Sequence, residues 1–540
     1  MLSFLGFLAI LCPLVIVHEF GHFFFAKLFN VKAEAFSVGF GPRLFKKQIG
    51  ETEFRLSIIP LGGYVKLLGE DPEVEMSEED RKRALHNQVP WKRFFIFFGG
   101  PLFNFLFAIV IFMAILVIGE PKMMNVIGRV IDGSPAQVAG IQSGDRVVNV
   151  NGVETPLYVD FLNQISEYPG KTVSLGINRE GSASPITLKA PVSEQPGFSV
   201  YGEPKRIGVI EGVYPVSLSS EVGVSSPESW AAQNGIQTGW KILAINGISV
   251  QSWESVKARY HSVLMGGKVD FFFETKEGEQ RHIVASRGKD TIEKDLGIYS
   301  TELFIKEVVP ESPAQAAGLL AGDRIVKIGT QSLNSFFDLK KEIQRQSENK
   351  KEVLVTWESQ GKIKSGKIVP TETIEKDPNL KKIKTFTIGV LPIMALAPPM
   401  TTIQRVWNPF KLLYLGTKRM AIFTWRNVVT IGKMFSGDVS VKTLGGPILI
   451  GKVAGESINR GLIAFLTTMA VLSVGLGFLN ILPVPVLDGG HLLLLGVEMI
   501  RGKPLSMKQM ELAQQVGLVA ILTLMVVVMK NDLSRLSIFN

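Results

Sequence analysis

Long apolar stretches without charge constrain the fold of this chain more than any other feature. Three such stretches are residues 94–119, 461–488 and 512–530. The first contains no charged residue, and the second and third contain none until their last residues, Asp488 and Lys530. With a rise of about 1.5 Å per residue, a helix of any of these lengths can cross the hydrocarbon core of a bilayer. The sequence therefore predicts a membrane span in each stretch.

The N-terminal residues 1–26 form a fourth apolar stretch, which contains His18, Glu19 and His22. A secretory signal peptide is the alternative interpretation. No basic residue precedes the apolar run and no small-residue cleavage pattern follows it, so we expect a transmembrane helix here as well. Ionisable side chains at membrane depth cost free energy and usually serve a function.

The composition indicates membrane spans combined with water-soluble domains. Hydrophobic residues make up 46% of the chain, which is high for a soluble enzyme, whereas 20% charged residues is high for a bundle of spans alone. The net charge of +9 is modest for 540 residues and there is no basic low-complexity arm, so we expect no nucleic-acid partner. The single cysteine, Cys12, excludes an internal disulfide and a cysteine-based zinc cluster.

Basic residues predict which side of the membrane each loop faces. The short loop at residues 27–93 contains twelve Lys or Arg residues, and positive charge in short loops marks the cytoplasmic side. The long segment from about 120 to 460 then lies outside the cytoplasm. The predicted fold class is a multi-pass α-helical membrane protein with four spans and soluble domains inserted between spans two and three.

The long segment contains an internal repeat. Three sequences align without gaps at intervals of 95 and 83 residues: AGIQSGDRVVNVNG at 139–152, NGIQTGWKILAING at 234–247 and AGLLAGDRIVKIGT at 317–330. Each predicts a short helix ended by glycine, a Gly-Asp turn and an alternating strand. The pattern resembles the PDZ domain of bacterial membrane proteases, although Trp240 replaces the turn aspartate in the second copy. We expect α+β PDZ-like domains at residues 124–195, 205–290 and 300–372.

The role of these repeats has three interpretations. PDZ-like modules receive an extended peptide beside a strand, or they cover a substrate path as a size filter. The third interpretation, that the repeats only pack on one another, also stays open.

His18, Glu19 and His22 form the pattern H-E-x-x-H. Four residues apart on a helix, both imidazoles face the same way and can bind one zinc ion. The adjacent Glu19 can reach a water molecule at that ion. A catalytic zinc usually has three protein ligands, so we expect a further polar group at membrane depth.

Asp488 is the candidate for the third ligand. It ends the charge-free run in NILPVPVLDGGHL, in which Asn480, Pro483 and Pro485 interrupt helical hydrogen bonding. A broken helix is tolerated in a span where it lines a cavity in the protein. The alternative is a helix-end carboxylate that meets water, and the presence of H-E-x-x-H favours the ligand. His491 is a partner of a ligand, a spare ligand or, as we favour, an interface histidine.

Six motifs occur together along the chain: HEFGH at 18–22, GFGP at 39–42, PLGGYVK at 60–66, GGPLFN at 99–104, GGPILIGKVAG at 445–455 and N-x-x-P-x-P-x-L-D-G at 480–489. With these motifs and its repeats, the chain resembles the site-2 protease family of intramembrane zinc metalloproteases, in its bacterial RseP-like branch. The pairing of the two metal motifs in this order is specific to the family. Members commonly have one or two PDZ-like domains, and this sequence has three.

The resemblance implies a zinc metalloendopeptidase. His18, His22 and Asp488 match the family's Zn²⁺ ligands, and Glu19 matches its catalytic glutamate. The implied activity is regulated intramembrane proteolysis of single-span membrane proteins, such as anti-sigma factors or remnant signal peptides, after an upstream site-1-type protease has acted. The implied location is the bacterial cytoplasmic (inner) membrane, with the PDZ-like domains on the periplasmic side. The alternative is a non-catalytic PDZ-containing membrane adaptor, which would require the metal motifs to be relics.

Substrate contacts are expected at two places. Asn480 matches a family residue that hydrogen-bonds the substrate backbone. Strand-like stretches within 27–93 predict a membrane-associated β region, with glycines at Gly39, Gly41, Gly62 and Gly63. Its edge either takes up an unwound substrate by strand addition, as the resemblance favours, or belongs to a self-contained hairpin.

Basic and aromatic residues among apolar ones also predict an amphipathic membrane-surface helix at residues 401–436. A plain linker helix is the alternative.

Overall fold

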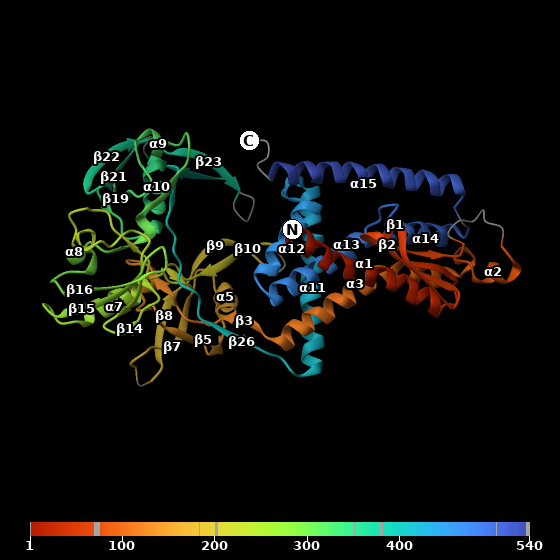
Figure 1. The fold of residues 1–540 in the computed structure, drawn as a ribbon, viewed down its shortest axis with the longest axis horizontal. Coiled ribbons are helices and arrows are strands. Elements are labelled where there is room, and N and C mark those ends of the chain that lie inside the picture. Colours follow the sequence, from red (N-terminus) through yellow and green to blue (C-terminus); the bar gives the residue numbers. More distant parts are fainter. Residues whose placement is uncertain are drawn as a thin grey trace. The chain divides into compact units, whose positions relative to one another are not determined.

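The computed structural model describes residues 2–69, 76–182, 184–199, 203–349, 352–376, 382–503 and 505–535. Most of the chain divides into two compact units (Figure 1). The helical unit contains residues 1–120 and 403–540, and the repeat unit contains residues 121–199 and 204–402.

Among the described residues, four helices of the helical unit are long and apolar enough to cross a membrane. They are α1 (Leu2–Leu28), α3 (Pro90–Ile118), α13 (Leu462–Ile481) and α15 (Met507–Arg535). The backbones of α1 and α3 approach closely. A β-carbon built on Gly21 would stand 2.2 Å from the carbonyl oxygen of Gly99, so only glycine fits at this position. Glycine at such a crossing lets two membrane helices pack with their backbones almost in contact.

The third apolar stretch is helical over a shorter range than the predicted 461–488. Helix α13 ends at Ile481, and the two prolines that follow, Pro483 and Pro485, cannot continue a helical hydrogen-bond ladder. Val486 then adopts a φ of 94°, and Asp488 begins a separate helix, α14 (Asp488–Arg501). Helix α14 was not predicted from the sequence.

The helix expected at 401–436 also begins later. Residues 401–404 form strand β26 (Thr401–Gln404), and helix α11 spans Pro409–Phe435. It begins there because the Asn408 side chain accepts a hydrogen bond from the Lys411 backbone N–H at 3.0 Å, and Pro409 occupies the first turn. Gly416 of α11 lies against Ile109 of α3. A further helix, α12 (Pro447–Asn459), precedes α13 and was not predicted.

The loop between α1 and α3 contains a bent β-hairpin. Strands β1 (Ala33–Ile49) and β2 (Thr52–Leu67) pair antiparallel in more than one register, so that Ser37 lies opposite both Arg55 and Tyr64. The start of β1 therefore lies between two parts of β2. Residues 64–67 pair with β1 along one side.

The repeat unit contains three repeats with the same order of elements: a short helix, two short strands, a longer helix and two longer strands (Figure 1). Repeat 1 consists of α4 (Pro135–Val138), β5 (Arg146–Val150), β6 (Val153–Glu154), α5 (Tyr158–Ser166), β7 (Thr172–Asn178) and β8 (Ile186–Pro191). Repeat 2 consists of α6 (Trp230–Gln233), β13 (Lys241–Ile245), β14 (Ile248–Ser249), α7 (Trp253–Ser262), β15 (Lys268–Glu274) and β16 (Gln280–Ser286). Repeat 3 consists of α9 (Pro313–Ala316), β19 (Arg324–Ile328), β20 (Gln331–Ser332), α10 (Phe336–Asn349), β21 (Val353–Ser359) and β22 (Lys362–Ile368).

The three four-stranded sheets have equivalent strand orders, β6-β5-β7-β8, β14-β13-β15-β16 and β20-β19-β21-β22. Each repeat has its own hydrophobic core. Two-stranded pairs connect or flank the repeats: β4 (Arg129–Val130) with β11 (Val213–Tyr214), β9 (Ser193–Phe198) with β10 (Pro204–Val209), β12 (Val222–Gly223) with β17 (Tyr299–Ser300), β18 (Ile305–Val308) with β25 (Val390–Pro392), and β23 (Thr371–Lys376) with β24 (Lys382–Thr387).

The repeats differ in the segment that packs beside their longer helix. In repeat 1 this segment is β10, in which Gly208 lies against the carbonyl oxygen of Ile165 in α5. In repeat 3 it is β24, whose backbone at Lys384 and Phe386 is hydrogen-bonded by the Gln344 side chain of α10. Repeats 1 and 3 therefore place a strand next to the longer helix.

In repeat 2 a short helix, α8 (Ile292–Leu296), packs beside α7. Ile292 and Leu296 are buried in the repeat's core. The Asp295 carboxylate between them accepts hydrogen bonds from the Tyr260 hydroxyl at 2.8 Å and from Arg287 at 3.0 Å. The short helix α8 therefore closes repeat 2 at the position where repeats 1 and 3 have a strand.

Candidate metal centre

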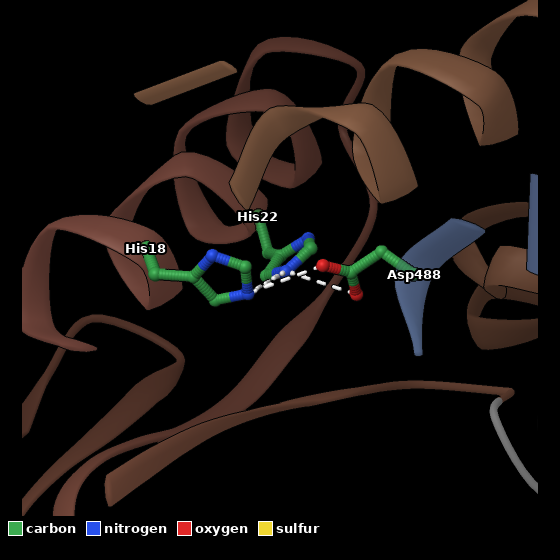
Figure 2. Close-up of side chains that lie close together, drawn as sticks. All are labelled: His18, His22 and Asp488. Atoms are coloured by element: carbon green, nitrogen blue, oxygen red, sulfur yellow. Dashed lines mark hydrogen bonds and ion pairs between the residues drawn. The ribbon is translucent and has the colours of Figure 1, made fainter. Parts of the chain in front are cut away.

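The side chains of His18, His22 and Asp488 converge at one point of the helical unit (Figure 2). Both histidines come from α1, one turn apart, and their Nε2 atoms lie 3.3 Å from each other. Asp488 Oδ2 lies 3.2 Å from Nε2 of His18, and Asp488 Oδ1 lies 3.5 Å from Nε2 of His22. The three potential ligand atoms all lie within 4.8 Å of one another.

The turn between α13 and α14 brings Asp488 to the histidines. A β-carbon on Gly489 would stand 2.2 Å from the carbonyl oxygen of Ile481, and one on Gly490 would stand 2.4 Å from that of Val484. Two glycines after Asp488 therefore let the first turn of α14 pack directly on the end of α13. This packing fixes where the Asp488 side chain begins.

Helix α3 contributes contacts to the other ring nitrogen of each histidine. His22 Nδ1 lies 2.8 Å from the carbonyl oxygen of Ile96, and His18 Nδ1 lies 3.1 Å from the amide nitrogen of Asn104. The predicted substrate residue Asn480, in the last turn of α13, has its amide nitrogen 3.3 Å from His18 Nε2.

Glu19 and the hairpin residue Gly63 lie side by side. A β-carbon on Gly63 would stand 3.2 Å from Cγ of Glu19. The Glu19 carboxylate is also hydrogen-bonded to the backbone of Val65. Strand β2 therefore runs beside Glu19 at Gly63 and Val65.

The other predicted hairpin glycines lie against residues of the hairpin itself. The nearest neighbours of Gly39 and Gly41 belong to Ile59, and that of Gly62 is the ring of Phe40. Gly39, Gly41 and Gly62 have φ values of 88°, 85° and 131°, which favour glycine. These three glycines shape the hairpin, and Gly63 is the one brought next to Glu19.

The donor set fits a zinc ion. Two imidazole nitrogens and a carboxylate oxygen are typical zinc ligands, and three protein ligands leave a position for water or substrate. Asp488 Oδ2 is buried and accepts no hydrogen bond from the described residues, and its close polar contact is His18 Nε2 at 3.2 Å. A β-carbon on Gly100 would stand 2.4 Å from His22 Nε2 and 2.6 Å from His18 Cε1, so glycine at this position keeps space free at the donors.

His491 lies one turn after Asp488 and stacks on the ring of Phe97, with ring centroids 4.9 Å apart and an interplanar angle of 13°. Nearby, Arg93 of α3 forms an ion pair with Glu498 of α14 at 2.9 Å. These contacts hold α14 against α3. Neither the ion pair nor the contact of Asn104 with His18 was predicted from the sequence, in which Asn104 appeared only within the motif GGPLFN.

Comparison with known proteins decides the family. Residues 6–524 match the model of peptidase family M50. The chain belongs to this family. It is 30% identical to the regulator of sigma-E protease RseP of Escherichia coli, over 99% of this chain and 100% of that protein. It is also 29% identical to protease RseP of Yersinia pestis, over 99% of each chain.

A relative from Neisseria meningitidis, 30% identical over 99% of each chain, has zinc metalloprotease in its name. A solved PDZ domain protein from Parabacteroides distasonis matches 49% of this chain and 94% of its own at 12% identity, but the TM-score of 0.13 carries no argument.

The predicted resemblance is therefore confirmed, and this M50 peptidase is a zinc metalloprotease of the site-2 type, acting within the membrane. The four apolar helices found among the described residues, together with the relatives, indicate a bacterial inner-membrane protein with PDZ-like parts.

Proposed function

We propose that this M50 peptidase cuts single-span membrane proteins within their transmembrane segments, at a zinc ion held by His18, His22 and Asp488. The observation that carries the proposal is the convergence of these three side chains within 4.8 Å, with Glu19 on the same helix. When bound, zinc supplies a Lewis acid that activates water near neutral pH and polarises a carbonyl group.

Glu19 acts as general base and then as general acid in this proposal. Its carboxylate accepts a proton from the attacking water and later donates a proton to the leaving amine. The hydrogen bond from the Val65 backbone and the contact with Gly63 hold the carboxylate in place. The apolar residues of α1 and α3 around the site limit access of bulk water.

The hairpin edge and Asn480 hold the substrate extended. A transmembrane helix shields its own amides, so it has to unwind before hydrolysis. Strand β2 runs beside Glu19 at Gly63 and Val65, so a substrate strand that adds to the hairpin there would lie next to this carboxylate. The Asn480 amide lies close to His18 and can hydrogen-bond the backbone of the same substrate.

The names of the relatives support a substrate class. Since similar proteins are named regulators of sigma-E, anti-sigma factors are our first candidate substrates, followed by remnant signal peptides. We propose that an upstream site-1-type protease first shortens the substrate. The positive loop at 27–93 would face the cytoplasm and the repeats the periplasm, where they filter substrates by size or bind them.

The test is cleavage of a tagged single-span model substrate by the wild-type protein and by two variants, with bound zinc measured in each. Glu19→Gln should abolish cleavage and leave zinc content unchanged, because only the base is lost. Asp488→Ala should lose zinc together with activity. Full zinc and full activity in Asp488→Ala would disprove the ligand assignment, and normal cleavage by Glu19→Gln would disprove its catalytic role.

Reporter fusions test the orientation separately. A reporter near Glu51 should be cytoplasmic and one near Gly247 should lie on the opposite side. Finding both on one side of the membrane would contradict the proposed orientation.

A further inference from the structure

Asn104 occupies a buried position between three helices of the helical unit. It has no exposed surface. Its side-chain amide faces His18 of α1, and its backbone carbonyl accepts a hydrogen bond from the Ser473 hydroxyl of α13 at 2.7 Å. Its side-chain oxygen, Oδ1, is buried without a hydrogen-bond partner in the described structure.

The ring nitrogen of His18 that carries the proton determines whether Asn104 has to accept or donate a hydrogen bond. A neutral imidazole carries one N–H, and it can bind a metal through Nε2 only when that proton is on Nδ1. Nδ1 is then a donor and needs an acceptor. An Asn104 amide that donates to Nδ1 would instead select the tautomer with the proton on Nε2, which has no lone pair for a metal.

Rotating the Asn104 amide by about 180° exchanges its oxygen and nitrogen, which have nearly the same shape. The oxygen that now has no partner would then accept from Nδ1–H of His18. The contact of 3.1 Å is a normal hydrogen-bond length in either orientation. Only the orientation with the oxygen toward His18 is compatible with a metal on Nε2.

His22 obtains the same tautomer by another route. Its Nδ1 lies 2.8 Å from the Ile96 carbonyl oxygen, which can only accept a hydrogen bond. A backbone carbonyl cannot be removed by substitution. Of the two histidines, His18 is therefore the one whose tautomer depends on a side chain.

We propose that Asn104 is a positioning residue of the metal centre, whose amide oxygen holds the His18 ring with its proton on Nδ1 and Nε2 toward the metal. This inference rests on the proposed zinc ligands. Partners of this kind fix the orientation and tautomer of metal-binding histidines, and their removal typically lowers metal affinity about 10- to 100-fold.

Three variants of the full-length protein test the proposal, each measured for zinc affinity by competition with a chelator and for the absorption spectrum of the cobalt-substituted protein. Asn104→Leu keeps the volume and removes the acceptor, so it should weaken zinc binding about 10- to 100-fold and alter the cobalt spectrum. Asn104→Asp keeps an acceptor in the same place and should bind zinc as tightly as the wild type. Ser473→Ala removes the neighbouring hydrogen bond to the Asn104 backbone and should leave zinc affinity unchanged.

A role in packing alone predicts the opposite order, because a buried site tolerates leucine better than a carboxylate. The proposal is overturned if Asn104→Leu binds zinc like the wild type, or if Asn104→Asp loses as much affinity as Asn104→Leu. If Asn104→Leu does not fold, the zinc affinity of Asn104→Asp still decides, since wild-type affinity supports the proposal and a large loss overturns it. Failure of the underlying zinc site is distinguishable, because Asp488→Ala would then bind zinc as the wild type does.

Discussion

Gly100 of α3 lies so close to His22 of α1 that a β-carbon on the glycine would stand 2.4 Å from Nε2 of the histidine. Gly100→Ala should therefore displace a zinc donor without changing any proposed ligand. We expect zinc affinity to fall at least about tenfold, comparable with loss of a supporting contact to a ligand, and cleavage to fall with it. Gly475→Ala in α13 is the matched control, because its added carbon would have no atom of another described segment within 4 Å. Equal zinc affinities in the two variants would contradict the prediction.

Asn480→Ala should slow cleavage while zinc stays bound. The amide nitrogen lies 3.3 Å from His18 Nε2, and amide side chains are not among the usual protein ligands of zinc. Each lost hydrogen bond to substrate should raise the activation free energy by about 0.5–1.5 kcal/mol. Cleavage rates on several substrates, with zinc content as the control, measure this effect. Loss of zinc would show instead that Asn480 belongs to the metal centre.

The ion pair of Arg93 with Glu498 should stabilise the placement of α14, which begins with Asp488. Arg93 Nη1 lies 2.9 and 3.0 Å from the two carboxylate oxygens, and both side chains are mostly buried. Glu498→Ala should destabilise the protein by about 1.5–3 kcal/mol, as expected for hydrogen bonds to a charged group. The double variant with Arg93→Ala should lose less than the sum of the single variants. Additive losses in thermal unfolding would show that the pair is not coupled.

Asp295→Ala should open repeat 2 locally. Arg287 and Asp295 are 8% and 11% exposed, and removing one partner of a buried pair typically costs about 3–5 kcal/mol. Hydrogen exchange in α7 and α8 should accelerate. Asp290→Ala removes a partner from an exposed pair with Lys294 and should change exchange little. Unchanged exchange in Asp295→Ala would contradict a closed repeat 2.

Glu51 should make the hairpin region sensitive to acid. Arg83 and Lys27 hydrogen-bond its carboxylate at 2.7 and 2.6 Å and lower its pKa from 4.5 to about 2. A depressed pKa stabilises the folded state above the unfolded-state pKa, and this contribution is lost as the pH falls from about 4.5 to about 2. The difference in melting temperature between wild type and Glu51→Gln should therefore be larger at pH 7 than at pH 3. A difference that stays constant with pH would exclude this linkage.

The sequence predicted those parts of the molecule that depend on local spacing. His18 and His22 are four residues apart on a helix, so their shared direction follows from helical geometry alone. The repeats were visible because each conserves its glycine turn within the chain. Pro483 and Pro485 also predicted a break in the helix of the third span, and helix α13 stops at Ile481, just before them.

Contacts between distant segments gave no such pattern. Asn104 and His18 are 86 residues apart, and an asparagine in an apolar run has no spacing that identifies its partner. The helix α8 that closes repeat 2 is only five residues long, too short for a periodic signal. Both features arise from packing between segments, which leaves no periodic pattern or fixed spacing in the sequence.

The separation of the three proposed metal donors along the chain has a consequence for biosynthesis. His18 and His22 emerge from the ribosome early, whereas Asp488 follows only when most of the 540 residues have been translated. Two protein ligands rarely retain a catalytic zinc. On the proposed ligand assignment, a nascent chain would enter the membrane without a complete zinc site, and it would gain hydrolytic activity only after the segment with Asp488 has been inserted.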